Sequence, residues 1–317
     1  MLVTSEGLYW QGSALPWQGP LFARLCALAG DGRLPHALLL TGPRGAGKSR
    51  LAAAVASWLL CRSPGAEGAC GQCESCALTR GGSHGDLRWL APEESKRAIG
   101  IDAVRGVVGF MQQTPGYGNY KVLVIEPAEA MTIAAANALL KTLEEPPGQA
   151  AIIMISNRPG ELPATVRSRC SMIAVPLPAE ADALQWLIQV SGCEEVMAEQ
   201  ALVLAGGQPV LGAEMLAEGT EARIALATLL ARCATGEAVD DAELRHAFEK
   251  FDVEAALETS ILCIERVLRK SPGSPRAQSL FRQRDQLMAW LSGVRRGINL
   301  GREPILNEMV RLLGRSD

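Results

Sequence analysis

The protein has 317 residues, of which 48% are hydrophobic and 21% charged, which is ordinary globular composition and long enough for two or three domains. Its net charge of −3 is not typical of a protein that binds nucleic acid by charge alone. No apolar run approaches the ~20 residues needed to cross a bilayer, and residues 1–12 lack the pattern of a signal peptide. We therefore expect a cytoplasmic protein with no membrane partner.

Apolar runs alternate with helical patterns through the first half of the chain. Three runs that are typical of strands buried on both faces cover residues 36–41, 122–125 and 151–155. One helix is predicted from Ser49 to Cys61, and a second, capped by Thr132, over 134–145 before Pro146. Repeated strand–helix–strand units predict an α/β sheet covered by helices on both faces.

A phosphate-binding loop is predicted where the first of these strands meets the first helix. The segment fits G-x-x-x-x-G-K-[ST] and consists of Gly42, Pro43, Arg44, Gly45, Ala46, Gly47, Lys48 and Ser49. In such loops backbone N–H groups and the helix N-terminus surround phosphate oxygens, the lysine reaches the β and γ phosphates, and the hydroxyl ligates Mg²⁺. We expect ATP and Mg²⁺ to bind here. The alternative is a Gly-rich turn that binds nothing.

The acidic half of this nucleotide site departs from the usual pattern. An active site needs one carboxylate for Mg²⁺ at the end of a neighbouring strand and a second group that orients water. The strand at 122–125 is followed by Glu126, which can replace the first, and by Pro127, which has no proton acceptor. Glu129 is close in sequence, but we expect it to point elsewhere. Because positioning supplies nearly all the catalysis in phosphoryl transfer, we predict binding without hydrolysis.

Four of the nine cysteines form a cluster in the sequence: Cys61, Cys70, Cys73 and Cys76. Disulfides are rare in reducing compartments, so clustered thiols indicate a metal. Four thiolates suit a structural, tetrahedral Zn²⁺. An iron–sulfur cluster is the alternative, although the fourth cysteine expected shortly downstream is missing. His84 is a possible substitute ligand, but its Gly-rich context favours a loop residue.

The pattern becomes entirely helical after Pro178. Ala-, Leu- and Glu-rich segments continue to the C-terminus and are interrupted by Gly and Pro at 206–209 and 271–275. We predict three domains: a nucleotide-binding domain over 1–175 with a zinc module at about 61–84, a small helical domain over 176–212, and an all-helical domain over 213–317.

Charge is distributed unevenly along the chain. Residues 264–317 hold 11 Lys and Arg against 5 Asp and Glu, a net of +6, which leaves −9 for residues 1–263. Such a basic segment can contact phosphates or an acidic partner, or it can be a solvated helical surface.

Together these segments resemble the bacterial clamp-loader subunits of the AAA+ class. The resemblance is carried by residues 33–40, the phosphate loop, the cysteine cluster, and residues 99–102, 120–125, 136–147 and 162–170. Its most specific parts are the stretch from Asn137 to Pro147 and the tripeptide Ser168-Arg169-Cys170. It covers about the first 175 residues. The helical half resembles the family only in its general pattern.

The resemblance implies an AAA+ domain with a zinc module, a helical lid, and an all-α collar domain that oligomerises. It also implies a place in the DNA polymerase III holoenzyme, a DNA-directed DNA polymerase and hence a nucleotidyltransferase. The expected partners are gamma/tau motor subunits and a delta subunit, and through the complex the sliding clamp and primer–template DNA. ATP binding would drive clamp opening, and hydrolysis triggered by DNA would release the clamp.

Two departures from the motor type of clamp-loader subunit bear on activity. That type carries Asp-Glu where this chain has Glu126 and Pro127, and a lid arginine near the position of Val210. Both departures resemble the stationary, ATPase-silent type, whose phosphate loop is often altered although this one is intact. In the family the arginine matching Arg169 is an arginine finger, which would act on ATP in the neighbouring gamma/tau subunit. The alternative is a structural arginine, a role for which Arg167 is the better candidate.

Two other functions stay open from the sequence. The chain could be an active, gamma/tau-like motor ATPase of the same loader, which measurable turnover would favour. It could also be a zinc-containing nucleic-acid-binding protein that uses the phosphate loop only structurally. Tight, salt-sensitive DNA binding by the isolated chain would favour that function.

Overall fold

The computed structural model describes residues 13–93, 96–117, 120–217, 220–298 and 301–314. The chain divides into two compact units, one ending at Pro178 and the other beginning at Ala179. We call them the α/β unit and the helical unit.

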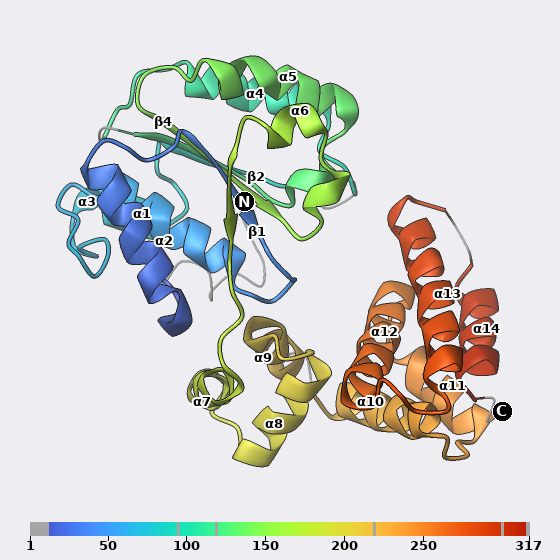
Figure 1. Ribbon diagram of the computed structural model, residues 1–317. Coiled ribbons are helices and arrows are strands. Elements are labelled where there is room, and N and C mark those ends of the chain that lie inside the picture. The colour runs from blue at the N-terminus through green and yellow to red at the C-terminus, as the bar shows by residue number, and fades with distance from the viewer. Residues whose placement is uncertain (1–12, 94–95, 118–119, 218–219, 299–300, 315–317) are drawn as a thin grey trace. The chain divides into compact units, whose positions relative to one another are not determined.

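A parallel sheet of five strands forms the centre of the α/β unit (Figure 1). In the order β2-β3-β4-β1-β5, its strands are β2 (Leu87–Leu90), β3 (Lys121–Ile125), β4 (Ala150–Ser156), β1 (Ala37–Thr41) and β5 (Ser171–Ala174). The predicted strands are confirmed as β1, β3 and β4, which lie in the middle and are buried almost throughout. The two edge strands are short and partly exposed, so their apolar patterns are too weak to predict.

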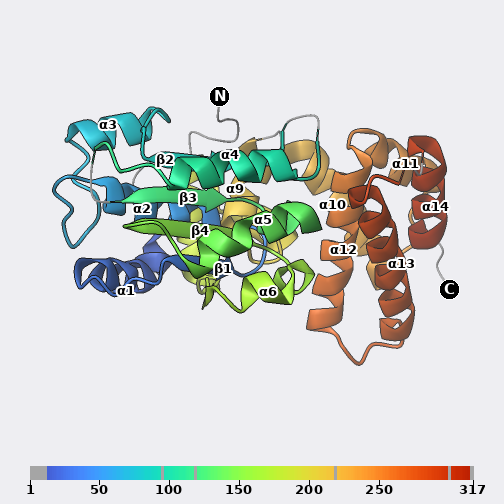
Figure 2. The same ribbon diagram turned by 90° about the horizontal axis from the view of Figure 1, so that it is seen from above.

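Helices cover both faces of the sheet, as predicted (Figures 1 and 2). On one face lie α1 (Gly19–Gly30) and α2 (Lys48–Leu60), and on the other α4 (Ile101–Met111) and α5 (Ile133–Glu144). Side chains alternate along β1, so Leu38 and Leu40 pack towards α2 while Leu39 packs towards α5. Thr132 caps α5 as predicted, because its Oγ1 accepts the N–H of Ala135 at 3.2 Å.

Short elements join the strands and helices of this unit. They are the helices α3 (Glu74–Arg80) and α6 (Ala164–Arg167) and the 3₁₀ turns η2 (Pro16–Gln18), η3 (Ala128–Ala130) and η4 (Pro159–Glu161). In both views α3 lies beside α2 (Figures 1 and 2). The phosphate loop, η3 and η4 follow β1, β3 and β4, respectively. They therefore lie at the carboxyl ends of these parallel strands, where ligands of open α/β folds bind.

The described residues of the helical unit form no strand, which agrees with the predicted helical half. Its helices are α7 (Glu180–Ser191), α8 (Glu195–Leu204), α9 (Pro209–Ala217), α10 (Thr220–Thr235), α11 (Asp241–Glu249), α12 (Val253–Lys270), α13 (Ala277–Arg295) and α14 (Arg302–Gly314). The larger core, around the fully buried Phe248 and Leu257, is shared by α10 to α14. The predicted boundary at residue 212 falls inside α9, and the division of this half into two domains stays a prediction.

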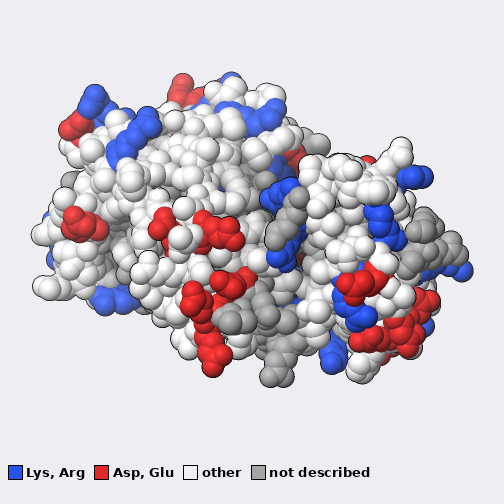
Figure 3. All heavy atoms as spheres, turned by 60° about the horizontal axis from the view of Figure 1, so that its bottom comes forward, with Lys and Arg blue, Asp and Glu red and all other residues white. Residues whose placement is uncertain are grey.

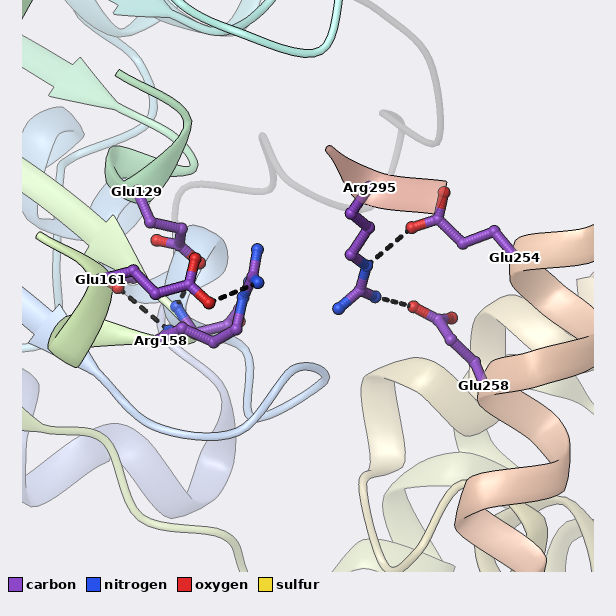
Figure 4. A network of polar contacts seen from close by, with 8 residues as sticks. Glu129, Arg158, Glu161, Glu254, Glu258 and Arg295 are labelled. Atoms are coloured by element: carbon purple, nitrogen blue, oxygen red, sulfur yellow. Dashed lines mark hydrogen bonds and ion pairs between the residues drawn. The ribbon is translucent and has the colours of Figure 1, made fainter. Parts of the chain in front are cut away.

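Ion pairs also join helices in this unit. Arg295 of α13 donates from Nε to the carboxylate of Glu254 at 2.9 Å and from Nη2 to that of Glu258, both on α12 (Figure 4). None of the helices in the described ranges is long and apolar enough to cross a membrane.

Candidate functional site

The phosphate loop lies between β1 and α2, where the sequence predicts it. Gly45 and Gly47 have φ values of 77° and 81°, which side chains rarely adopt, and Gly47 forms the N-cap of α2. Space is the second constraint on Gly47. A Cβ atom there would lie 2.3 Å from Leu15 Cδ1 and 2.9 Å from Gln18 Nε2. Only glycine therefore fits between the loop and the segment that precedes α1.

Lys48 is almost completely buried within this loop, with 4% of its surface exposed. Its Nζ donates to the carbonyl oxygens of Gly42 at 2.9 Å and Pro43 at 2.7 Å, and to Asn157 Oδ1 at 2.7 Å. An ammonium group has three protons, so each proton has a protein acceptor. The loop is folded around its own lysine.

Burial also changes the basicity of Lys48. Loss of solvation lowers its pKa to about 8, although the negative charges of Glu126 and Glu129 oppose this fall. Both carboxylates therefore lie within electrostatic reach of the lysine.

Glu126 lies directly beyond β3 and reaches the loop. The Ser49 hydroxyl donates to Glu126 Oε1, which joins the two residues expected on the Mg²⁺ side of the site. Burial raises the pKa of the Glu126 carboxyl, while the Ser49 hydrogen bond and the Lys48 charge act in the opposite direction. The longer side chain of glutamate thus still reaches the loop, whereas Pro127 contributes no acceptor from its side chain.

The expectation that Glu129 points away from the site is wrong. Its Oε1 accepts the N–H of Asn157 at 3.1 Å, the residue whose side chain also receives the Lys48 ammonium. Its Oε2 is buried without a hydrogen-bond partner among the described residues. In Figure 4 Glu129 lies beside Arg158 and Glu161, which form an ion pair at 2.6 Å. The 3₁₀ turn η3 returns this carboxylate towards the end of β4, and sequence spacing alone does not indicate such a turn.

The four predicted cysteines come together at the junction of α2 and α3. Their sulfur atoms all lie within 4.8 Å of one another. Cys61 ends α2 and Cys73 caps α3, and the Sγ–Sγ distances are 4.0 Å from Cys61 to Cys73 and 3.9 Å from Cys70 to Cys76. Zn–S bonds of about 2.3 Å in a tetrahedron place sulfur atoms about 3.8 Å apart, so the cluster fits Zn²⁺.

Backbone N–H groups point at these sulfur atoms, as expected for thiolate ligands. Cys61 Sγ accepts from Cys70 N at 3.2 Å and from Ser63 N at 3.4 Å, and Cys73 Sγ accepts from Cys76 N at 3.4 Å. Burial acts to raise the pKa of Cys73, but backbone N–H donors together with the neighbouring Cys76 and Cys70 thiols outweigh it and bring that pKa to about 6. Burial raises the pKa of Cys76 to about 12. A bound cation would favour the thiolate form of all four.

His84 lies outside the cysteine cluster and connects α3 to the rest of the unit. Its Nδ1 accepts the N–H of Asp86 at 3.0 Å, so Nε2 carries the proton and donates to Ser75 Oγ at 2.7 Å. Ser75 in turn donates to the carbonyl of Leu60 at 2.5 Å. Burial lowers the pKa of His84, which keeps the ring neutral. His84 is therefore not a metal ligand here but a buried link between two ligand-bearing segments.

A buried ion pair continues this link into the sheet, and sequence reasoning missed it. Asp86 and Lys121 Nζ lie 2.9 Å apart, with both side chains almost fully buried. Asp86 also accepts the N–H groups of Gly116 and Tyr117 at 2.7–3.0 Å. Burial acts to raise the pKa of Asp86, but these donors and Lys121 hold it below its usual value. The only available signal was a charged residue at the start of an apolar strand.

A family model decides the assignment. The family described as "DNA polymerase III, delta subunit" matches residues 17–178, which are 162 of the 317 residues. The chain belongs to this family. The matched span contains the phosphate loop, the cysteine cluster and Arg169, and it ends where the α/β unit ends.

Similar proteins with curated names bear on the type of subunit within the family. The chain is 45% identical to DNA polymerase III subunit delta' of Pseudomonas aeruginosa over 205 residues, 64% of this chain and 62% of that protein. It is 39% identical to subunit delta' of Escherichia coli over 194 residues, 61% of this chain and 58% of that protein. A DNA polymerase III subunit tau from Bacillus subtilis is 33% identical over 138 residues, 44% of this chain and 24% of that protein. The chain thus spans about 60% of the length of the delta' relatives it matches.

Among solved structures, a gamma subunit-related protein of DNA polymerase III from Thermotoga maritima has a similar fold. The TM-score is 0.55 at 18% sequence identity, and the match covers 94% of this chain and 99% of that chain. At this identity the likeness concerns the fold alone.

In this member of the family Arg169 is paired within its own chain. Its Nε donates to Glu144 Oε1 at 2.7 Å, and its Nη1 donates to the carbonyl of Thr165 at 2.9 Å. Arg167, the expected structural arginine, donates to the carbonyl of Pro159 at 3.4 Å. The role of Arg169 towards a neighbouring subunit stays a prediction.

Proposed function

We propose that the chain is the stationary, ATPase-silent subunit of a bacterial clamp loader. It would assemble in the cytoplasm with gamma/tau and delta subunits and help to load the sliding clamp onto primer–template DNA. The observation that carries this proposal is that the candidate nucleotide site lacks one of its catalytic groups. Lys48, Ser49 and Glu126 are in place, but Pro127 stands where the motor type has its water-orienting carboxylate. The similarity to proteins named delta' supports the same choice.

Nucleotide binding in this proposal is an exchange of partners at Lys48. The β and γ phosphates would replace carbonyl oxygens that now accept from its ammonium group, and backbone N–H groups of the loop would surround the other phosphate oxygens. Ser49 and Glu126 would hold Mg²⁺, which supplies charge neutralisation for the phosphates. Without a residue that orients water, the bound ATP would persist.

The four cysteines would hold one structural Zn²⁺. A closed set of four thiolates leaves no open position for substrate, so the metal would contribute folding free energy rather than chemistry. It would fix α3 and the loop before it to the end of α2.

The helical unit would supply the lid, with α7 to α9, and the collar that oligomerises, with α10 to α14. The exposed surface of the lid helices is acidic (Figure 3), with Glu180, Asp182, Glu194, Glu195 and Glu199 all exposed. No Lys or Arg occurs in the sequence between Arg169 and Arg223. Because such a surface repels phosphates, we assign DNA contact to the assembled complex and not to the lid.

Arg169 would act outside its own chain, as the arginine finger for ATP in the neighbouring gamma/tau subunit. A planar guanidinium stabilises the charge of the transferring phosphoryl group, and such fingers are worth roughly 10³–10⁵ in rate. Its place beyond α6, with the side chain 34% exposed, is compatible with reaching a neighbour.

One observation favours a second candidate, an active motor ATPase of the gamma/tau type. The Glu129 carboxylate lies near Lys48 and has a buried oxygen without a partner in the described structure, so it is the residue best placed to orient water in place of Pro127.

A single set of assays on the purified chain separates the two functions. We expect calorimetry to detect binding of ATP with Mg²⁺, and an extended phosphate-release assay to give no more phosphate than Lys48→Ala. Steady release that disappears in both Lys48→Ala and Glu129→Gln would establish the motor function instead. Mixing with gamma/tau and delta, followed by sizing, tests assembly. A chain that stays separate from both partners would overturn the proposal.

A further inference from the structure

The guanidinium of Arg169, the candidate arginine finger, contacts Glu144, the last residue of α5. Glu144 Oε1 accepts the Nε–H of Arg169 at 2.7 Å and also contacts Nη2 of the same guanidinium. The Nη1 group donates to the carbonyl of Thr165 at 2.9 Å. The side chains of Arg169 and Glu144 are 34% and 48% exposed, so the pair lies at the surface of the unit.

These contacts leave part of the guanidinium available. A guanidinium has five N–H donors in one plane. Two of them, on Nε and Nη1, donate to Glu144 and Thr165, and Nη2 also lies in ion-pair contact with Glu144, which leaves at least one N–H on each Nη. Within the described part of the chain these two donors have no partner. N–H groups of a guanidinium form strong, charge-assisted hydrogen bonds with phosphate oxygens, so Arg169 is oriented but still able to bind an oxyanion.

The contact between Arg169 and Glu144 contributes little to the stability of the fold. The C-terminal end of a helix carries partial negative charge, so the carboxylate of Glu144 is unfavourable there for α5 itself. Half-exposed ion pairs contribute little to the free energy of unfolding. Orientation of Arg169 is the more specific effect of Glu144, because a long unpaired side chain samples many rotamers.

We propose that Glu144 is the positioning residue of the Arg169 finger. It holds the guanidinium so that the two remaining N–H groups face the γ-phosphate of ATP in the neighbouring subunit, and it does not touch the nucleotide itself. This inference rests on the proposed function, because the phosphate belongs to the partner. A misplacement of about 1 Å can cost on the order of 10²-fold in rate, so loss of Glu144 should approach loss of the finger.

The test uses loaders reconstituted with gamma/tau, delta and variants of this chain. Arg169→Ala removes the finger, Glu144→Ala removes its support, Glu144→Gln keeps an acceptor oxygen, and Glu145→Ala is the control at the adjacent exposed residue. We measure DNA-stimulated ATPase and the ADP–fluoroaluminate trapped per complex. Arg169→Ala and Glu144→Ala should each lose the trapping of one site and lower kcat at unchanged KM. Glu144→Gln should fall between them and wild type, and Glu145→Ala should match wild type.

The outcomes separate this inference from the proposed function. If Arg169→Ala lowers trapping while Glu144→Ala matches wild type, the positioning role is overturned and the finger stands. If Arg169→Ala matches wild type in an intact complex, the finger fails and the positioning role fails with it.

A measurement on the isolated chain does not depend on assembly. The Nε–H resonance of Arg169, assigned by its absence in Arg169→Lys, should shift in Glu144→Ala and stay in place in Glu145→Ala. An unchanged resonance in Glu144→Ala would show that the carboxylate does not hold the guanidinium, and would overturn the inference.

Discussion

At the scale of single residues, Lys48 makes stability depend on pH. Burial holds its pKa at about 8, below the ordinary lysine value of 10.5, so the buried charge destabilises the folded state below pH 8 and this cost disappears as pH rises towards 10. Between these values the unfolded chain binds the proton and the folded chain does not, so wild type should gain stability relative to Lys48→Met. We expect a relative gain of about 1–2 kcal/mol, less than the shift implies because of residual solvation.

Denaturant unfolding of both proteins at pH 7, 8, 9 and 10 measures this difference. Subtracting the free energy of unfolding of the variant from that of wild type removes the effects of the cysteines and other groups that titrate in the same range. A difference that stays constant from pH 7 to 10 would mean that Lys48 is solvated and that the phosphate loop is more open in solution than in this structure.

Residue identity predicted much of the nucleotide site, but not the direction of every side chain. The loop pattern predicts Lys48 and Ser49 at the turn between β1 and α2, because phosphate binding requires those residues at that spacing. The direction of Glu129 is not predictable in this way, because it depends on η3, a turn whose backbone no sequence period specifies. Asn157 was missed for a related reason, since only the parallel pairing of β4 with β1 brings it to Lys48.

At the scale of elements, the junction of α2 and α3 should depend on zinc. We expect about one Zn²⁺ per chain in freshly purified protein, because four thiolates form a closed tetrahedral set. Cys73→Ser should lower the metal content and increase hydrogen exchange in α3, while the amides of β1, β3 and β4 stay protected. Elemental analysis and hydrogen exchange measure both effects. Iron in place of zinc, or no metal at all, would contradict the assignment.

The buried link through His84 should stabilise the same junction in its neutral form. The His84→Ala substitution removes the imidazole ring and leaves Ser75 Oγ without its hydrogen-bond donor. We expect the free energy of unfolding to fall by about 1–3 kcal/mol at pH 8. Burial lowers the pKa of His84, so the unfolded chain takes up the proton first as pH falls. The stabilisation is therefore full above the ordinary histidine pKa and declines below it.

Comparison of wild type and His84→Ala at pH 8 and pH 5.5 tests this pH dependence. The difference in free energy of unfolding should be smaller at the lower pH. Lys96, an exposed lysine in an ion pair with Glu93, offers a control, and Lys96→Ala should change stability little at either pH. An equal effect of His84→Ala at both values would show that the ring does not change its charge in this range.

Elements with strong hydrophobic or cysteine patterns in the sequence were predictable, and elements with weak patterns were not. The runs that became β1, β3 and β4 are apolar because both faces of each strand are covered, and cysteine spacing alone located the four-cysteine cluster. In contrast, β2 is four residues long and only its first residue, Leu87, is buried, and its pairing with β3 depends on the tertiary fold.

At the scale of the whole molecule, each unit has its own hydrophobic core, so we expect calorimetry to resolve two unfolding transitions. ATP with Mg²⁺ binds the α/β unit in our proposal and should raise only one transition. At 100 times the dissociation constant, the added stability is about 2.7 kcal/mol. Lys48→Ala should abolish the shift. A shift of both transitions, or a shift that survives in Lys48→Ala, would contradict nucleotide binding at the phosphate loop.

Gln18 provides a natural spectroscopic probe of the phosphate loop. Its buried Nε2 donates one proton to the carbonyl of Ala46 at 3.1 Å and the other to that of Gly47 at 2.9 Å, and its Oε1 accepts the N–H of Leu15. Both amide protons should exchange slowly with deuterium, which is unusual for a side chain, and their two resonances should be well separated. Isotope labelling of glutamine alone would therefore report any movement of the loop without a dye, a substitution or a change to the chain.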